Sequence, residues 1–386
     1  MTKALPFRLP GPVDGDVDLL VVAAEHSGDQ HAGRMVRGVL AAEPERRVAA
    51  LGGPALAAAG AQLLEDLTAQ STMGFAVFGK LSFYRTLIAE VVRWVGAHRP
   101  KAVCFVDSSG LNLRIAKGLF DAGFSAKAGG PTKALYYISP QIWASRAKRR
   151  FQMAEHLDGL ASIFPFEREV YADTSLAVEF VGHPFVAADY QPPVTYDPAG
   201  PVLLLPGSRH GVVKRLFPVM LEAFAGMAGT RQAMTLYPSD GILDTLKAAR
   251  PPKTLQFLRT GETDGPVGAS AVLTTSGTMS MHCALAGIPG VVTYKTDPLT
   301  YWLGRMLVKV KFIGIANLLL KEEMYPEFIQ GAATARTLGH ELQQALENPE
   351  RVARTQVQSG QLRELLSAAA QNTASEWMRG QLKSGD

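Results

Sequence analysis

The sequence predicts two tandem α/β domains, each built around a doubly wound parallel sheet. Apolar strand patterns alternate with amphipathic helix patterns along most of the 386 residues, which is typical of parallel sheets covered by helices. The alternation is interrupted between residues 183 and 200, where four prolines indicate a linker between domains. Polar or glycine-rich turns follow strands in both halves, as expected where the carboxyl edge of a sheet binds a ligand.

In the first half, short apolar runs predict buried strands, and apolar stripes predict helices. Leu87, Val91 and Val95 lie on one stripe together with Ile88 and Val92, which is the helical periodicity of a core-facing helix. The expected strands cover residues 18–25, 48–53, 101–107, 134–139, 159–164 and 179–182. The expected helices cover residues 31–41, 81–98 and 111–122.

The same alternation restarts after the linker and ends in a helical tail. The expected strands are 201–207, 233–238, 255–259, 269–275 and 290–295, with a helix over 213–227, and the chain from 333 onward has no strand pattern. We therefore expect a first domain over residues 1–185, a second over 200–332 and a C-terminal helical segment over 333–386. Two such domains in tandem are expected to leave a ligand-binding cleft between them.

Composition limits the class of protein. Hydrophobic residues make up 47% of the chain and charged residues 19%, as in folded proteins. The net charge of +4 is too small to imply nucleic acid, and it suits an anionic small molecule or membrane surface equally well. Cys104 and Cys283 lie in apolar runs, which favours buried thiols in a reducing compartment. With no apolar run of about 18 residues, we expect a cytoplasmic protein, soluble or peripheral.

The most informative turn follows the apolar run 203–205. It consists of Pro206, Gly207, Ser208 and Arg209, and a helix pattern comes next. Backbone N–H groups at such a helix start, together with one guanidinium, predict a site for an anionic group such as phosphate.

A second turn of this kind lies further along the same half. Ser276, Gly277 and Thr278 follow the apolar run 269–275 and precede another helix pattern. An ordinary turn or helix cap stays the alternative at both positions.

Carboxylates rather than cations follow the strands of the first half. Glu25 follows the first strand and Asp107 follows the strand at 101–107. A base at one edge and an anion site at the other suggest transfer from a phosphorylated donor. Asp107 as a helix cap, and Glu25 as a partner of local backbone, remain open. The further polar candidates at these strand ends are Ser27, Asp29, Asn112 and Ser139.

Two unusually apolar segments, residues 73–85 and 298–311, mix aromatic side chains with lysine and arginine. This composition favours contact with a membrane surface or with acyl chains. A core helix whose basic ends reach solvent is the alternative.

In this order and spacing, the motifs resemble those of lipid-A-disaccharide synthases, a family of inverting glycosyltransferases with a fold of two Rossmann-like domains (GT-B). The resemblance covers about residues 19–330. The motifs that carry it are residues 23–29, 52–54, 72–74, Asp107 with 112–113, 139–144, 165–167, 182–184, 206–209, 276–278 and 298–319.

The resemblance implies a reaction between UDP-2,3-diacylglucosamine and 2,3-diacylglucosamine 1-phosphate that forms a β-1,6-linked disaccharide phosphate and UDP. It implies Asp107 as the candidate general base and Glu25 facing the reacting sugars. The other positions implied in acceptor or sugar binding are Ser27, Asp29, Met73, Asn112 and Ser139. Those implied in UDP binding are Gly207, Ser208, Arg209, Ser276, Gly277, Thr278 and Asn317.

Neither a cofactor nor a metal is expected, because Arg209 and the helix N-termini would stabilise the departing UDP in place of a divalent ion. The expected partners are the UDP-sugar donor, the acylated glucosamine phosphate acceptor and the inner membrane surface, where the protein would be peripheral. Nucleic acid is not expected, and a homo-oligomer is possible.

Six positions depart from the family pattern: Val77, Gly110, Tyr136, Ser145, Val212 and His282. Acidic residues are usual at Val77, Gly110, Val212 and His282. The departures keep two alternatives open. One is a divergent paralogue that binds acylated sugars without turnover or with altered specificity. The other is a different nucleotide-sugar enzyme on this fold, such as an epimerase.

Overall fold

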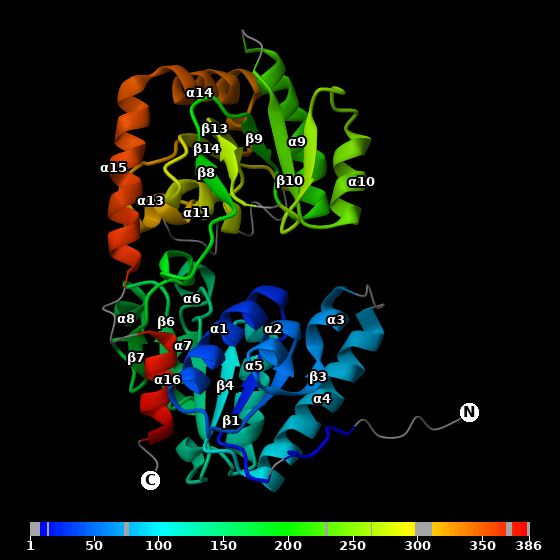
Figure 1. The fold of residues 1–386 in the computed structure, drawn as a ribbon, viewed down its shortest axis with the longest axis vertical. Helices are drawn as coiled ribbons and strands as arrows, with labels where there is room; N and C mark the ends of the chain where they lie inside the picture. Colours follow the sequence, from blue (N-terminus) through cyan, green and yellow to red (C-terminus); the bar gives the residue numbers. More distant parts are fainter. Residues whose placement is uncertain are drawn as a thin grey trace, which may run out of the picture. The chain divides into compact units, whose positions relative to one another are not determined.

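The structure, a computed structural model, describes residues 8–13, 15–72, 77–227, 231–263, 265–297, 311–367 and 373–383. Side chains at 70–72 and 77–82 lie outside this description. The chain forms two compact units, one of Met1–Pro184 with Ala368–Asp386 and one of Phe185–Ser367. Each unit contains one central sheet with helices packed on it (Figure 1), so the predicted α/β class is confirmed.

The sheet of the first unit has seven strands in the order β3-β2-β1-β4-β5-β6-β7, and each neighbouring pair is parallel. The strands are β1 (Leu19–Val22), β2 (Val48–Gly52), β3 (Gln62–Asp66), β4 (Ala102–Val106), β5 (Lys133–Tyr137), β6 (Gly159–Ser162) and β7 (Ala177–Phe180). The helices between them are α1 (His26–Ala42), α2 (Pro54–Ala58), α3 (Leu67–Thr72), α4 (Val77–His98), α5 (Ser109–Asp121), α6 (Ile142–Ser145), α7 (Arg149–His156) and α8 (Glu167–Val170).

Continuous apolar sequence explains the central strands of this sheet. Every residue of β1 and β4 is buried, as expected for parallel strands covered by helices on both faces. On one face, Leu20 and Phe105 pack with Trp94 of α4 and Ile115 of α5 in a single core. Because β1 and β4 are parallel neighbours, their carboxyl ends lie at the same edge of the sheet.

The last helix of the chain, α16 (Ala374–Lys383), belongs to the first unit although it follows the second in sequence. Arg379 and Lys383 of α16 form ion pairs of 2.9 and 3.2 Å with Glu43, which follows α1. These contacts hold the lower red helix in Figure 1 beside α1. The helical tail expected from residue 333 is therefore shared between the two units.

The second unit has a six-stranded sheet in the order β11-β10-β9-β13-β14-β15, again with parallel neighbours. The strands are β9 (Val202–Leu205), β10 (Ala233–Tyr237), β11 (Gln256–Arg259), β13 (Ala271–Thr274), β14 (Gly290–Tyr294) and β15 (Glu327–Ile329). The helices are α9 (His210–Ala225), α10 (Asp240–Ala248), α11 (Thr278–Leu285), α13 (Ile315–Leu320), α14 (Ala335–Glu347) and α15 (Pro349–Leu366).

Two expectations about this half are wrong in detail. The segment 183–200 is more than a linker, since it contains β8 (Val194–Tyr196), which pairs in parallel with β12 (Val267–Ala269). The single strand expected over 269–275 is divided at Ser270 into β12 and β13, which join different sheets. Ser270 donates its N–H to the carbonyl of Pro201 (3.0 Å), so the chain crosses from one sheet to the other at this residue.

Within the described ranges, no helix combines the length and the apolar character that a membrane span requires. Cys104 and Cys283 are both buried and free, as expected from the apolar runs that contain them. Burial raises the pKa of the Cys283 thiol to about 12 and moves that of Cys104 upward as well. Both thiols are therefore protonated, inert groups of the core.

Candidate active site

Each sheet reverses its direction of winding at one place. In the first unit the chain moves outward from β1 to β2 and β3, and later from β4 to β5, β6 and β7. In the second unit the corresponding neighbours are β9 and β13. The carboxyl ends at such a reversal form a crevice where doubly wound sheets bind ligands. Glu25 and Asp107 follow β1 and β4, whereas Arg209 and Ser276 follow β9 and β13.

Asp107 is held in an uncommon backbone conformation. Its φ is +51° and that of Ser108 is +38°, values that non-glycine residues rarely adopt. Asn112 Nδ2 donates to the carbonyls of Val106 (3.1 Å) and Asp107 (2.9 Å), and the Tyr136 hydroxyl also donates to the Asp107 carbonyl. These bonds offset the strain of the Asp107 backbone.

The Asp107 carboxyl is suited to accept a proton. Burial raises its pKa, the nearby charge of Glu25 raises it further, and the Ser108 N–H lowers it. A base with a raised pKa accepts a proton more readily near neutral pH. The N-cap residue of α5 is Ser108, without a side-chain cap bond, so the capping alternative for Asp107 finds no support.

Glu25 precedes the first turn of α1 and is exposed. It occupies the N-cap position of that helix, but its side chain makes no capping hydrogen bond. Its carboxylate is therefore available to solvent or ligand, while its charge acts on Asp107. The structure thus brings together the two acidic residues that the sequence singled out.

Unsatisfied polar groups gather at this edge. Among the described residues, eight buried polar side-chain atoms lack a hydrogen-bond partner, and four of them follow β4, β5 or β6. Buried polar groups without partners are rare in folded proteins and often mark functional regions. The four atoms are Ser108 Oγ, Asn112 Oδ1, Trp143 Nε1 and Glu167 Oε1.

Glu167, the first residue of α8, is fully buried. Burial raises the pKa of this carboxyl to about 8, although the Phe164 N–H and the neighbouring Trp143 indole and Ser139 hydroxyl lower it. Phe164 N donates to Oε2 at 3.2 Å. Glu167 lies in the motif at residues 165–167, but no role could be predicted for it, because its isolation from water depends on the tertiary fold.

The other residues predicted near the acceptor have different surroundings. Ser27 is exposed in the first turn of α1, open to a ligand. Ser139 is buried, and its Oγ lies 2.8 Å from the Tyr171 hydroxyl. Asn112 acts on the Asp107 backbone, as described above. Met73 lies outside the described residues.

Asp29 has a structural task. It is fully buried, and its carboxylate accepts hydrogen bonds from the backbone N–H groups of Gly53 (2.8 Å), Ala55 (2.9 Å) and Leu56 (3.2 Å). These are the first N–H groups of α2, which a carboxylate stabilises. With its oxygens occupied in this way, we do not carry Asp29 into the proposed substrate contacts.

In the second unit, the two predicted turns lie side by side. Gly207 has a φ of +96°, and a Cβ at this position would approach Thr275 Oγ1 to 3.0 Å. Glycine is therefore required both by the backbone conformation and by the neighbouring turn. Thr275 N donates to the Leu205 carbonyl (3.1 Å), which extends the strand pairing into the start of both turns.

Exposed donors surround these turns. Arg209 is exposed at the N-cap of α9, and its Nη1 lies 3.5 Å from the Tyr294 hydroxyl. Ser208, Gly277 and Thr278 are also exposed and Ser276 partly so, at the starts of α9 and α11. A Cβ at Gly277 would meet nothing within 4 Å. Open space, helix N-termini and one guanidinium make an arrangement that can bind a diphosphate.

Asn317 resembles Asp29 in being occupied by its own fold. It is buried in α13, and Nδ2 donates to the Tyr325 carbonyl (2.7 Å) and Glu327 Oε1 (2.8 Å). Oδ1 accepts from the N–H groups of Met324 (2.9 Å) and Tyr325 (3.0 Å). This amide joins α13 to the loop before β15, so we assign it a positioning role.

The departures from the family pattern have separate surroundings. Tyr136 supports the Asp107 backbone, and Gly110 is exposed three residues after Asp107. Val212 packs in the hydrophobic core of the second unit. His282 is buried. The centroid of its ring lies 4.0 Å from the centroid of the Phe185 ring, and the Tyr190 hydroxyl lies 3.2 Å from His282 Nε2. The side chain of Val77 lies outside the described residues.

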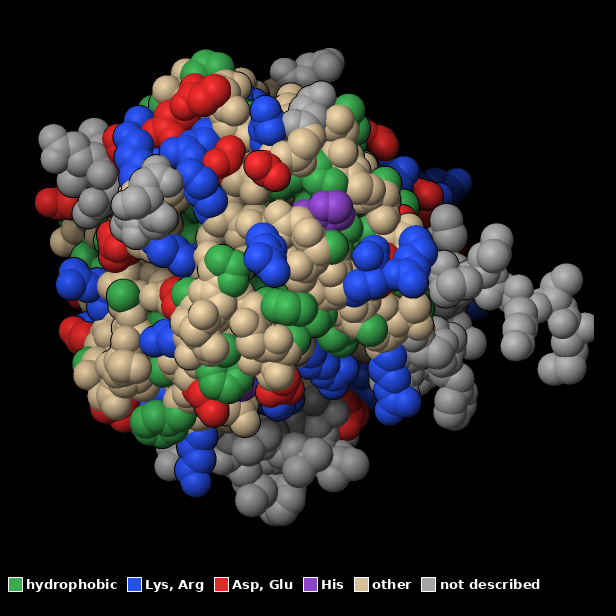
Figure 2. All heavy atoms as spheres, turned by 90° about the horizontal axis from the view of Figure 1, so that it is seen from below, with side chains coloured by type: hydrophobic (Ala, Val, Ile, Leu, Met, Phe, Trp, Pro, Cys, Tyr) green, Lys and Arg blue, Asp and Glu red, His purple; other side chains and the backbone are tan. Residues whose placement is uncertain are grey.

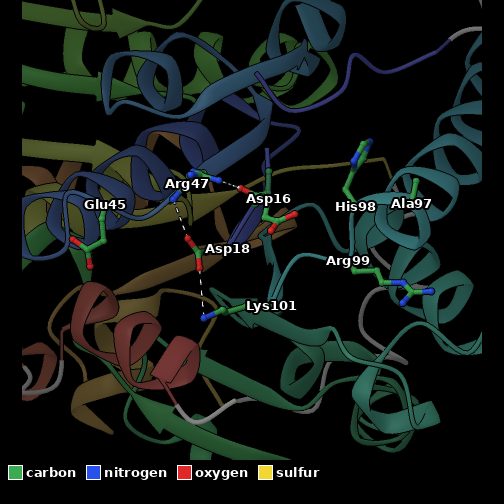
Figure 3. Close-up of a pocket in the computed structure, with 9 residues that line it drawn as sticks. Asp16, Asp18, Glu45, Arg47, Ala97, His98, Arg99 and Lys101 are labelled. Atoms are coloured by element: carbon green, nitrogen blue, oxygen red, sulfur yellow. Dashed lines mark hydrogen bonds and ion pairs between the residues drawn. The ribbon is translucent and has the colours of Figure 1, made fainter. Parts of the chain in front are cut away.

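A cavity of about 560 Å³ lies at the opposite, amino end of the first sheet. Three acidic and three basic side chains line it. Lys101 pairs with Asp18 at 3.7 Å, and the backbone N–H of Arg47 donates to Asp18 at 3.0 Å (Figure 3). On the face shown in Figure 2, the coloured basic and acidic side chains are likewise interspersed. Acidic and basic side chains are therefore balanced around this cavity, and we do not place the substrate site there.

Comparison with known sequences gives the same family across the chain. The family described as lipid-A-disaccharide synthetase matches residues 19–380. Lipid-A-disaccharide synthase 1 of Legionella pneumophila (strain Lens) is 32% identical over 366 residues, covering 91% of this chain and 94% of that protein. Lipid-A-disaccharide synthase of Syntrophus aciditrophicus (strain SB) is 34% identical over 365 residues, covering 90% and 93%.

Comparison with solved structures gives the fold. Acinetobacter baumannii MurG has a TM-score of 0.52 at 14% identity, with 95% of this chain and 99% of that chain covered. The calicheamicin glycosyltransferase CalG4 has a TM-score of 0.56 at 13% identity, covering 95% and 98%. UDP-GlcNAc 2-epimerase from Neisseria meningitidis has a TM-score of 0.58 at 10% identity, covering 95% and 99%. The expected GT-B fold is confirmed, and at these identities the likeness extends to the fold alone.

Proposed function

The chain belongs to the lipid-A-disaccharide synthetase family of glycosyltransferases, and we propose how its two sheet edges divide that reaction. The first unit binds the acylated glucosamine 1-phosphate acceptor, and the second binds the UDP-2,3-diacylglucosamine donor. The observation that carries this division is the contrast between the acid groups after β1 and β4, where Asp107 has a raised pKa, and the exposed donors after β9 and β13.

In the proposed chemistry, the 6-hydroxyl of the acceptor attacks the anomeric carbon of the donor. Asp107 takes the hydroxyl proton as the new C–O bond forms, the bond from the anomeric carbon to UDP breaks, and UDP leaves with the electron pair. Attack opposite the leaving group inverts the anomeric centre and produces the β-1,6 linkage. Raising the pKa of Asp107 by burial and by Glu25 makes this proton transfer more favourable.

The leaving UDP gains negative charge in the transition state. Arg209 and the first N–H groups of α9 and α11 are the groups we assign to stabilise that charge. Such donors act mainly on the transition state when they are aimed at the position where charge develops. Asn112 and Tyr136 contribute indirectly, because their hydrogen bonds hold the Asp107 backbone.

We further propose that the enzyme reaches its acylated substrates at the cytoplasmic face of the inner membrane. The candidate contact segments are residues 73–85 and 298–311, most of which lie outside the described residues. Binding at an interface scales with buried apolar area and attraction to anionic lipid. Replacing Phe75 and Phe78 with serine should reduce co-sedimentation with anionic liposomes, and unchanged sedimentation would remove this segment from the role.

The direct test of the proposed reaction uses purified full-length protein with UDP-2,3-diacylglucosamine and 2,3-diacylglucosamine 1-phosphate. We expect UDP release in equal amount to the β-1,6-linked disaccharide phosphate, and neither product when one substrate is omitted. UDP release without the acceptor would indicate that the protein hydrolyses or epimerises the UDP-sugar donor. No release with both substrates, from folded protein that binds them, would identify a binding paralogue.

A further inference from the structure

One guanidinium near Asp107 has no carboxylate partner in the part of the chain that the structure describes. Arg149, the first residue of α7, is partly buried, and its Nη1 lies 3.5 Å from Ser109 Oγ at the start of α5. Among the described residues it forms no ion pair, whereas the adjacent Arg150 binds Asp173 through bonds of 2.7 and 2.6 Å. A guanidinium that no carboxylate occupies can bind an anionic ligand through paired hydrogen bonds.

The position of Arg149 relates it to the candidate base. Ser109, which it contacts, is two residues after Asp107. The charges of Asp107 and Arg149 also act in opposite directions on the pKa of the buried Tyr136 phenol, which burial raises most. Tyr136 in turn donates to the Asp107 carbonyl. The guanidinium and the candidate base therefore surround the same small region at the end of β4.

The space beside these groups is open. A Cβ added at Gly110 would meet no heavy atom within 4 Å beyond its own neighbours. Gly110 is exposed in the first turn of α5, where a side chain would otherwise extend. The acid that the family resemblance led us to expect at this position would have partnered Arg149 or repelled an anion, and glycine does neither.

The proposed acceptor carries an anion at a matching place. Its phosphate is attached to C1 and its nucleophilic hydroxyl to C6, which is borne on C5, and C1 and C5 flank the ring oxygen. A hydroxyl bound at Asp107 therefore places the phosphate within one sugar ring of the base. A phosphomonoester carries about 1.5 to 2 negative charges at neutral pH, and arginine binds such groups through two parallel hydrogen bonds.

We propose that Arg149 binds the phosphate of the acceptor sugar and so makes the enzyme selective for a phosphorylated acceptor. This inference rests on the proposed function. The phosphate donates nothing to the reaction, so Arg149 acts on acceptor binding and orientation. Each unit then supplies one arginine to the phosphate group of its own substrate, Arg149 to the acceptor and Arg209 to the donor.

The test compares wild type with Arg149→Ala on two acceptors, 2,3-diacylglucosamine 1-phosphate and the same sugar without phosphate. We expect the variant to raise KM for the phosphorylated acceptor roughly 10- to 100-fold, the scale of hydrogen bonds to a charged group, with KM for the donor unchanged. On the phosphate-free acceptor, wild type and variant should perform alike. Arg149→Lys should recover part of the loss, because it keeps the charge without the planar fork.

Lys148→Ala is the matched control, since Lys148 is the neighbouring, exposed cation on the same segment. Little change is expected in this variant. An equal KM increase in Lys148→Ala would indicate a diffuse positive field and overturn the specific assignment. An equal loss of Arg149→Ala on the phosphate-free acceptor would also overturn it, because the residue would then act on something other than phosphate.

A binding measurement separates this inference from the proposed reaction. If wild type releases no UDP, the reaction assignment fails, but titration of glucosamine 1-phosphate into the folded protein still tests Arg149. Weaker binding in Arg149→Ala than in Lys148→Ala supports the site, and unchanged binding overturns it. Lost co-sedimentation of Arg149→Ala with phosphatidylglycerol vesicles, at unchanged glucosamine 1-phosphate binding, would assign the residue to lipid headgroups instead.

Discussion

The carboxyl edges of the two parallel sheets have opposite chemistry, although both end in strand-to-helix turns. The first edge holds Asp107, whose pKa is raised by burial and by Glu25, on backbone with a positive φ. The second edge holds the exposed Arg209 beside Gly207, which adopts its positive φ without strain from a side chain. The first edge is partly withdrawn from water, and the second is open to it.

On the proposed division of the reaction, this difference matches what each half of a glycosyl transfer needs. A general base benefits from an environment that disfavours its charge, so burial and a neighbouring carboxylate are useful to Asp107. A diphosphate brings its own charge and needs many donors, so exposed N–H groups and a guanidinium are useful at the second edge. Breaking one edge should therefore leave the function of the other largely intact.

The largest effect is expected for Asp107→Ala. Loss of a general base should lower kcat about 10²- to 10⁴-fold. Because the backbone φ of +51° favours asparagine over alanine, Asp107→Asn is the matched control that removes the base with less backbone strain. Both variants should lose turnover, and melting temperatures should show Asp107→Asn folded like wild type. Residual activity of Asp107→Asn above about a tenth of wild type would exclude the base role.

Glu167 allows a test of how far the first edge is withdrawn from water. Its folded-state pKa of about 8 lies above the ordinary value of 4.5. Between these values the folded protein keeps a proton that the unfolded chain has lost, so stability falls as pH rises through this window. Glu167→Gln should remove that dependence, with a difference on the order of a few kcal/mol between pH 5 and pH 9. Parallel stability curves for wild type and variant would mean that Glu167 is hydrated.

Arg209→Ala tests the second edge. We expect UDP affinity to fall by roughly 1.5–3 kcal/mol, the contribution of a hydrogen bond to a charged group, with the affinity for the acceptor unchanged. Isothermal calorimetry with UDP measures the first quantity. Tyr294→Phe is a useful companion, because Tyr294 lies 3.5 Å from Arg209 and should have a smaller effect. Equal UDP affinity in Arg209→Ala and wild type would falsify the assignment.

The smallest effect is expected for Glu25→Gln. Asp107 must be ionised to act as a base, so kcat/KM should fall at acidic pH through its pKa. Since the charge of Glu25 raises that pKa, removing the charge should move the acidic limb of the pH profile to lower pH. Glu25→Asp keeps the charge and should leave the limb nearly in place. A limb that stays fixed in both variants would mean that the two carboxyl groups are not coupled.

Much of the fold could be predicted because its central strands are continuous apolar runs. Residues 19–22 and 202–205 are buried on both faces, so every position in these strands is apolar and the sequence pattern reflects the burial directly. β3 (Gln62–Asp66), β8 (Val194–Tyr196) and β15 (Glu327–Ile329) were missed. β3 contains charged residues and is only partly buried, and β8 has three residues among prolines. Their pairing depends on neighbours that no local pattern contains.

The candidate site was predictable in position more than in role. Asp107 and Arg209 could be located from strand ends and turn residues alone. Asp29 and Asn317 are also polar residues near strand ends or turns, but each binds a group of its own fold. Asp29 binds the Gly53 N–H, and Asn317 binds Glu327. Sequence cannot distinguish a carboxylate or amide that binds a ligand from one that binds distant backbone. For the same reason the supporting bond from Tyr136 to Asp107 required the fold.

The division of the reaction between the two edges is tested most directly by the UDP affinity of Asp107→Asn. Calorimetry should give a UDP dissociation constant within about twofold of wild type, while disaccharide formation by the same preparation falls at least about 100-fold. Arg209→Ala, measured in parallel, should lose UDP affinity. If Asp107→Asn loses UDP affinity as strongly as Arg209→Ala, the two edges do not act separately, and the account is contradicted.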